Sequence, residues 1–331
     1  MLKTKFVKTF GTLVIVIANI FVVSMSNNSW SQDPTFTQFY SNPVYLNPAL
    51  AGATGCPRIA LNYRNQWPQL TGNYVTYSAA FDTYAKNVSG GIGLIAMHDQ
   101  QGQGTIQTSM IGGIYSYNLK VNRKFSLMFG ARAAYFQKFL DWDKLTFGDM
   151  IDPRRGFIYQ TGDVIRGNGR HGFFDASAGL VGFTKNFYFG VAGHHLNRPD
   201  ESMILGQSRL PIRVTGHMGA TIKIGQRGRY SSSTMLMPNI IYQYQNGFQE
   251  FNIGAYLRYE SFTIGAWYRN KDAFILSLGI STDKFRVGYS YDLTVSNLGG
   301  VSGGSHEISM GINLKCKKKP KNFRKISCPS F

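Results

Sequence analysis

The sequence predicts an all-β protein that forms a transmembrane antiparallel β-barrel of about 14 strands. Between residues 57 and 314, apolar or aromatic side chains alternate with small or polar ones in stretches that turn-forming residues close. Because successive side chains of a strand point to opposite faces, this period of two describes a sheet with one apolar and one polar face. The 37 glycines, 24 phenylalanines and 19 tyrosines suit a strongly curved sheet with aromatic rings at a membrane interface.

Residues 1–31 are predicted to be a cleaved secretory signal peptide. Lysines near the N-terminus precede an apolar run at residues 11–23, and small polar residues follow up to Ser31. The apolar run is too short to span a bilayer as a helix, and its flanks match an export signal. We therefore expect an exported mature chain that begins at Gln32.

Residues 32–56 show no strand periodicity and are predicted to form a short irregular segment in the barrel lumen or at its periplasmic mouth. Asn47, Pro48 and Gly52 resemble a helix cap, a first-turn proline and a stop around one helical turn. The candidate partner-binding residues of this segment are Phe36, Phe39 and Tyr40.

The outer-membrane barrel is predicted at residues 57–314. Its strands are expected at 57–66, 73–83, 89–98, 105–118, 124–137, 173–184, 187–196, 211–224, 234–245, 248–260, 261–269, 272–281, 284–292 and 304–314.

The connections between these strands fall into two groups of different length. Long connections at 138–172, 197–210 and 293–303 all follow odd-numbered strands, whereas even-numbered strands are followed by short turns such as 185–186 and 282–283. The one exception is the longer connection at 225–233, which follows the eighth strand. If both termini are periplasmic, the long connections face the cell exterior, as in outer-membrane barrels. A soluble sandwich gives no reason for this sorting.

The longest connection, residues 138–172, is the candidate surface for a cargo or partner protein. It combines aromatic with charged side chains, and such a loop can either fold into the lumen or meet a protein partner. The candidate partner-binding residues here are Trp142, Phe147, Arg154 and Arg155.

The formal net charge of +18 is concentrated in part at the C-terminus, where residues 315–331 contain lysines and an arginine but no acidic residue. In an exported chain without nucleic-acid recognition motifs, such a basic periplasmic tail is expected to contact anionic lipid or a partner protein and not nucleic acid. Cys316 could pair with Cys328 in this tail and leave Cys56 over, but the odd number of cysteines leaves the pairing open.

No catalytic, cofactor-binding or metal-binding site is predicted, so we expect a protein that is not an enzyme. The sequence contains no serine elbow and no nucleophile with an evident base. Adjacent His194 and His195 lie in a predicted strand, where neighbours point to opposite faces, so they are not expected to share a metal ion.

Several short motifs resemble the PorP/SprF family of type IX secretion system membrane proteins, and together they cover essentially the mature chain. They are QDPTFTQFYSNPVYLNPALAG at 32–52, YRNQWP at 63–68, HHLNRP at 194–199, YSYD at 289–292, GSHEI at 304–308 and CPSF at 328–331.

The resemblance implies an outer-membrane β-barrel that is needed to secrete, or attach to the cell surface, particular cargo such as large gliding adhesins. It also implies partners among the other type IX secretion components, in bacteria capable of gliding motility or their relatives. Two other functions share the barrel: a diffusion porin or small-solute transporter, and a purely structural anchor. A porin keeps an open charged lumen, whereas residues 32–56 suggest a plugged or narrow one.

Overall fold

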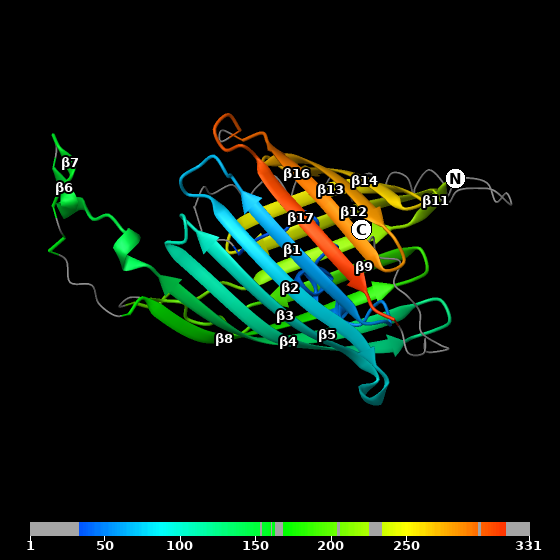
Figure 1. The fold of residues 1–331 in the computed structure, drawn as a ribbon. Coiled ribbons are helices and arrows are strands. Elements are labelled where there is room, and N and C mark those ends of the chain that lie inside the picture. Colours follow the sequence, from blue (N-terminus) through cyan, green and yellow to red (C-terminus); the bar gives the residue numbers. More distant parts are fainter. Residues whose placement is uncertain are drawn as a thin grey trace, which may run out of the picture.

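The computed structural model describes residues 33–152, 154–159, 161–162, 168–203, 206–224, 234–296 and 299–315. The chain forms a closed antiparallel barrel (Figure 1), in which β1 (Arg58–Gln66) pairs with β2 (Tyr74–Ala85) on one side and with β17 (Ser305–Asn313) on the other. The predicted fold class is confirmed, because the barrel has 14 strands.

The other barrel strands follow one another along the chain. They are β3 (Gly90–Gln101), β4 (Ile106–Lys120), β5 (Ser126–Leu140), β8 (Arg170–Phe183), β9 (Phe187–His194), β10 (Arg213–Ala220), β11 (Ile222–Ile224), β12 (Thr234–Gln245), β13 (Phe248–Tyr259), β14 (Phe262–Arg269), β15 (Ala273–Ser281) and β16 (Phe285–Thr294).

Strands β10 and β11 form one barrel strand that is interrupted where the sequence predicted continuity. Both pair with β12, and Gly219 lies opposite Asn239 while Ile222 lies opposite Leu236. The same register sets Ala220, where β10 ends, opposite Pro238, which has no N–H to donate to the ladder. The proline therefore accounts for the break.

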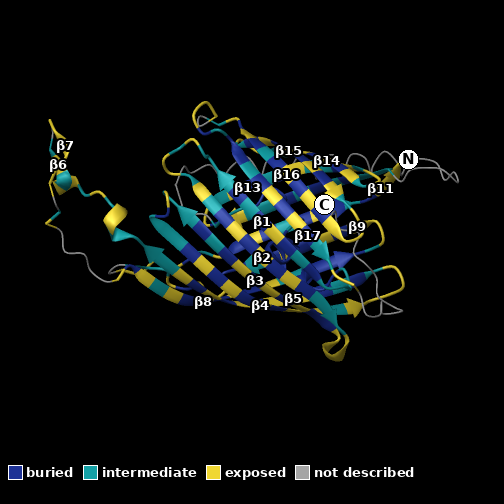
Figure 2. Ribbon diagram, viewed as in Figure 1, coloured by how far each residue is buried: buried dark blue, intermediate teal, exposed yellow. Residues whose placement is uncertain are grey.

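Side chains alternate between the outer surface and the lumen, as the period of two predicted (Figure 2). In β15, for example, Phe274, Leu276 and Leu278 are exposed on the outside, whereas Ile275 and Ser277 between them are buried. The outer face is thus a belt of aliphatic and aromatic groups, the surface that a barrel presents to lipid. In the part of the chain that the structure describes, no helix is long and apolar enough to cross a membrane.

The two ends of the barrel differ in the length of their connections. One end, the loop end, carries the long connections 67–73, 141–169, 195–212 and 295–304 and the short ones 102–105, 246–247 and 270–272. The opposite end, the turn end, carries 86–89 with η2 (Lys86–Val88), 121–125, 184–186, 260–261 and 282–284, together with residues 225–233, which lie outside the described residues. The predicted long connections all lie at the loop end.

The longest loop contains short structures that its sequence did not predict. These are η3 (Trp142–Lys144), η4 (Gly148–Met150) and the hairpin of β6 (Ile151–Asp152) with β7 (Gly156–Phe157). Figure 1 shows this hairpin standing away from the barrel instead of folding into the lumen.

Residues 33–56, called the plug from here on, lie inside the barrel. The plug contains one helical turn, α2 (Pro43–Leu46), and a 3₁₀ turn, η1 (Pro48–Leu50), and each turn begins with a proline. Asn47 caps η1 by accepting a hydrogen bond from the backbone N–H of Ala49 at 2.9 Å, so the predicted cap and first-turn proline are confirmed. The buried core of the protein is the interface between this plug and the barrel wall.

Cys56 is disulfide-bonded, which settles for this residue the question that the odd number of cysteines left open. This residue ends the plug, and the neighbouring Pro57 carbonyl accepts a hydrogen bond of 2.9 Å from the N–H of Leu314. The beginning and the end of the barrel chain therefore lie side by side at the turn end. Cys316, Cys328 and the predicted tail from residue 316 onward lie outside the described residues, as does the predicted signal peptide.

Candidate functional site

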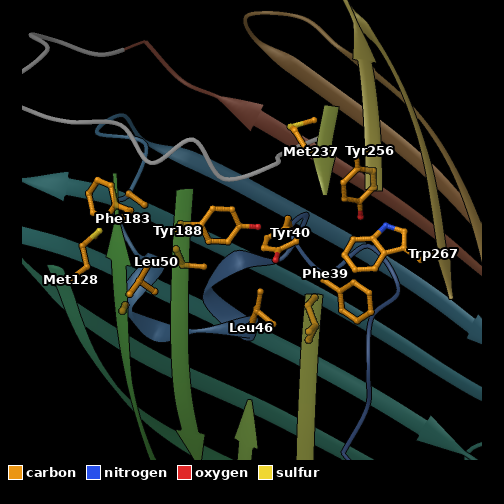
Figure 3. Close-up of a cluster of buried hydrophobic side chains, with 14 of the residues drawn as sticks. Phe39, Tyr40, Leu46, Leu50, Met128, Phe183, Tyr188, Met237, Tyr256 and Trp267 are labelled. Atoms are coloured by element: carbon orange, nitrogen blue, oxygen red, sulfur yellow. The ribbon is translucent and has the colours of Figure 1, made fainter. Parts of the chain in front are cut away.

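The plug fills the lumen through aromatic contacts with strands on several sides of the barrel (Figure 3). The ring of Phe39 lies 5.1 Å from that of Trp267 on β14, and the ring of Tyr40 lies 5.8 Å from that of Tyr188 on β9. All four side chains are buried. Two pockets beside the plug measure about 40 and 20 Å³, which is room for only a few water molecules each.

Glycines in the wall allow the plug backbone to approach the strands directly. A Cβ atom added at Gly130 on β5 would overlap backbone atoms of Pro48 and Ala49, and one added at Gly91 on β3 would overlap the carbonyl of Ala51. Only a residue without a side chain fits at such a contact. The η1 turn is therefore seated against β3 and β5 at positions that tolerate no larger residue.

A buried ion network joins Thr37 and Gln38 of the plug to β1, β16 and β17. The Arg64 guanidinium lies 2.9 Å from Asp292 and 3.4 Å from Glu307, and all three side chains are almost completely buried. Glu307 accepts hydrogen bonds from the backbone N–H groups of Thr37 and Gln38, and the Thr37 hydroxyl donates to Asp292 at 2.8 Å. Each buried charge thus has a partner, which a low-dielectric interior requires.

The C-terminal part of the plug is bound nearer the turn end. The backbone N–H of Gly52 donates to Asp82 at 2.8 Å, and the same carboxylate pairs with Arg58. The side-chain amide of Asn47 donates to the carbonyls of Leu180 and Val191, each at 3.2 Å. Hydrogen bonds between backbone and side-chain groups therefore connect the plug to the wall over the full depth of the lumen.

The N-terminal part of the plug is latched at the loop end by Asp33. Its carboxylate lies 2.7 Å from Nε2 of His195 and 3.2 Å from Arg213, while Nδ1 of His195 lies 2.7 Å from Asp175. Burial alone would lower the pKa of His195, but the charge of Asp33 and the hydrogen bonds to Asp175 and Asp33 raise it to about 9. Burial opposes ionisation of Asp33, yet the charges of His195 and Arg213 hold its pKa well below the usual range.

The expectation that His194 and His195 point to opposite faces is wrong. Strand β9 ends at His194, and His195 adopts a positive φ of 58°. This turn brings its ring back toward the lumen, and both side chains are buried there. The alternation rule holds only inside a strand.

The ion pair between protonated His195 and Asp33 of the plug should stabilise the folded barrel in a pH-dependent way. The pKa of His195 rises from 6.5 to about 9 on folding. The stabilisation is therefore complete below pH 6.5 and is lost as the pH rises through about 9. The free energy of unfolding should fall by on the order of 3 kcal/mol over this range. We expect the melting temperature of the wild type to fall over this range more than that of His195→Gln. Identical pH profiles for the two proteins would contradict a charged latch.

The structure places the predicted plug residues in the interior. Phe36, Phe39 and Tyr40 are all buried, and the ring of Phe36 packs edge-on against Tyr45 at 5.3 Å. They contact the barrel wall and the rest of the plug, so a partner reaches them only if the plug moves. Their role in partner binding stays a prediction.

The predicted loop residues lie on the projecting loop, spread along it. Trp142, the first residue of η3, and Phe147, the residue before η4, are half-buried. Arg154 and Arg155 are exposed at the tip of the hairpin. The backbone N–H groups of both arginines donate to Asp152 at 2.8 Å and lower its pKa. This tip also exposes the apolar side chains of Ile151, Phe157, Ile158 and Tyr159.

Sequence reasoning missed the charged residues of the wall that bind the plug, directly or through neighbouring side chains. Their only local signal is that each occupies a lumen-facing position within a barrel strand, where the alternation predicts polar side chains without naming their partners. The residues concerned are Arg58, Arg64, Asp82, Arg132, Asp175, Arg213, Asp292 and Glu307.

The motifs on which the family resemblance rests meet at this interface. Asp33 and Thr37 come from the first motif, and their partners Arg64, His195, Asp292 and Glu307 come from four others. Segments distant in sequence thus form one site, in which the plug is bound by the wall.

Three solved barrels illustrate the similarity to known structures. The outer membrane protein Omp33 of Acinetobacter baumannii has a TM-score of 0.43 at 8% identity, over 79% of this chain and 100% of its own. A FadL homologue of Pseudomonas aeruginosa has 0.44 at 13%, over 87% and 100%. The CymD monoaromatic hydrocarbon channel has 0.47 at 13%, over 85% and 94%. At these scores the three barrels carry no inference about function.

No curated protein matches the chain. The sequence profile of the family described as type IX secretion system membrane protein PorP/SprF, however, matches residues 28–312. This match covers the plug and nearly all of the barrel, including the motifs that bind one to the other. The chain therefore belongs to the PorP/SprF family of type IX secretion system membrane proteins.

Proposed function

We propose that this outer-membrane barrel serves the secretion or surface attachment of specific cargo, such as large adhesin-like proteins used in gliding motility. The observation that carries the proposal is the combination of a plugged lumen with an apolar loop tip that projects from one end. A filled barrel is a poor passage for solutes but a rigid platform for a binding loop. In this role the protein acts by binding and not by catalysis.

The loop tip has the composition of a protein-binding surface. Phe157, Ile158 and Tyr159 are 64%, 49% and 54% exposed and adjoin Arg154 and Arg155. Aromatic residues and arginine are enriched where protein interfaces carry most of their binding energy. The cargo, or a secretion component that delivers it, is the partner that we assign to this surface.

Removing the loop tip should abolish surface display of the cargo without affecting the barrel. The cargo is first identified as the protein that disappears from the cell surface when the gene is deleted. Replacing residues 146–162 with a short Gly-Ser linker spares the hydrogen bond of 2.7 Å between Leu140 N–H and the Gly169 carbonyl, which closes the loop base. We expect display to fall to the level of the gene deletion, while heat-modifiable gel mobility reports a folded barrel.

The triple variant F157S/I158S/Y159S tests the same surface with a smaller change. Its matched control is V88S/V121S, which removes exposed apolar side chains at the turn end. Normal cargo display by the triple variant and the loop replacement would reject the assignment of the loop. Normal display in the gene deletion itself would reject the proposed function.

The porin alternative makes a different prediction for purified protein. The plug fills the lumen between β3, β5, β14 and β17, and we therefore expect no large steady conductance steps in planar bilayers. Steps comparable to those of a general porin would favour the solute-passage function instead.

The remaining partners follow from the same arrangement. The apolar belt is the surface for outer-membrane lipid, the turn end faces the periplasm, and the basic tail from Lys315 onward is available there to other type IX secretion components. Export by a cleaved signal peptide at residues 1–31 completes the proposal.

A further inference from the structure

A pocket opens beside the plug at the loop end of the barrel. Thr108 near the start of β4, Phe136 near the end of β5 and Phe173 near the start of β8 form part of its wall, and Leu210 from the 195–212 loop covers one side. The rings of Phe136 and Phe173 are stacked, with centroids 5.3 Å apart. The pocket volume of about 40 Å³ is enough for a group of two or three heavy atoms in place of water.

Arg132 brings unpaired hydrogen-bond donors to this pocket. Its side chain is only 3% exposed, and Nη2 donates to Ser177 at 2.9 Å and to Asp175 at 3.3 Å. Nε and Nη1 of Arg132 have no hydrogen-bond partner among the described residues, and the same holds for Nε of Arg213, which also lines the pocket. Buried donors of a charged group are costly to leave unpaired, so this wall requires an acceptor.

The acceptor that fits a guanidinium best is a carboxylate, because both groups are planar and can form two parallel hydrogen bonds. The pocket already contains one example: Asp33 of the plug is held by His195 and Arg213. Other charges on the walls are mutually paired or hydrogen-bonded, Lys138 with Glu201, and Asp99 with Thr76 at 2.6 Å. The donors left for an incoming group are therefore Nε and Nη1 of Arg132, together with Nε of Arg213.

We propose that this pocket binds a carboxylate of a peptide segment of the secreted cargo, with Arg132 as its partner. The carboxylate comes either from an acidic side chain or from a chain terminus. This assignment rests on the proposed function, since it names the chemistry by which the barrel recognises its cargo at the loop end.

Three short peptides test the chemistry on the full mature chain in detergent. N-acetyl-Glu-Leu-amide offers only a side-chain carboxylate, N-acetyl-Ala-Leu offers only a terminal one, and N-acetyl-Gln-Leu-amide offers none. The reporter is the ¹³C-labelled methyl group of Met97, which lines the pocket, and Met237 in the plug interface is the internal reference. We expect at least one acidic peptide, and not the neutral one, to shift Met97 alone.

Two variants connect the shift to the pocket. Arg132→Gln should weaken acidic-peptide binding about tenfold or more, whereas Arg258→Gln, a lumen-facing arginine near the turn end, should not change it. Because Arg132→Gln also disturbs Asp175, Thr108→Phe provides a second variant that fills the pocket and leaves every charge in place. It should likewise abolish the shift of Met97.

The outcomes separate this proposal from the proposed function. Equal binding of the neutral peptide, absence of any shift, or a shift that survives in both pocket variants would overturn the carboxylate site. None of these results depends on secretion, so cargo display can still follow the loop tip if they occur. Conversely, a barrel that binds acidic peptides but whose gene deletion leaves every surface protein in place would retain the site and lose the function.

Discussion

Gly130→Val should expel the plug and convert a closed barrel into a conducting one. The new Cβ would overlap the backbone of Pro48 and Ala49, and backbone atoms cannot move aside as the end of a flexible side chain can. Overpacking of this kind costs about 3 kcal/mol, and at Gly130 it acts directly on η1. Because the plug contacts the wall over the full depth of the lumen, loss of the contact between η1 and β5 should open a water-filled path through the barrel.

The matched control is Gly113→Val on the neighbouring strand β4. Gly113 faces outward, and a Cβ there meets no atom within 4 Å, so the same change in strand propensity leaves the plug untouched. Planar-bilayer recordings should show large steady steps for Gly130→Val and none for Gly113→Val or the wild type. A silent Gly130→Val barrel whose gel mobility shows it to be folded would mean that the plug is not held at this seat.

Arg64→Met should destabilise the barrel by about 3–5 kcal/mol, the largest effect expected from a single side chain. The arginine is the cation shared by Asp292 and Glu307, and its removal leaves carboxylates in a buried site. Asp292 keeps a second cation, because Arg269 lies 3.3 Å away. Glu307 has no other salt bridge among the described residues, so most of the cost should arise there.

This difference between the two carboxylates gives a rescue test. Glu307→Gln removes the stranded charge and keeps one of the two oxygens that accept from the N–H groups of Thr37 and Gln38, so adding it to Arg64→Met should restore part of the lost stability. Urea unfolding followed by tryptophan fluorescence gives both free energies, and Arg123→Met at the exposed turn is the control for loss of a surface arginine. Additive losses in the double variant would contradict a coupled pair.

The barrel strands could be predicted because their signal is local. Alternation between lipid-facing and lumen-facing side chains is visible within one strand, and β13 (Phe248–Tyr259) differs from its predicted range by one residue at its end. Strand β5 extends to Leu140 beyond the predicted end because its ladder with β4 continues past Gln137 and Lys138, where the apolar alternation has already stopped. Pairing, and not side-chain pattern, decides the strand end there.

The site could be predicted only in part, since its contacts join residues far apart in sequence. The turn around Asn47 and Pro48 has a local signature and was found, whereas the bonds from Thr37 and Gln38 to Glu307 span about 270 residues. A polar residue at a lumen-facing position indicates the face but not the partner. The projecting hairpin was missed because backbone bonds to Asp152 shape it, without any repeating pattern.

The position of the buried ion network has a consequence for biogenesis. Glu307 and Asp292 belong to the last two strands to be synthesised, while Thr37 and Gln38 precede the first strand. A nascent chain that lacks these strands has neither a seam between β1 and β17 nor acceptors for the early segment. The N-terminal part of the plug therefore cannot dock at this network before β16 and β17 have been made, and a prematurely ended polypeptide leaves the N–H groups of Thr37 and Gln38 without their acceptor.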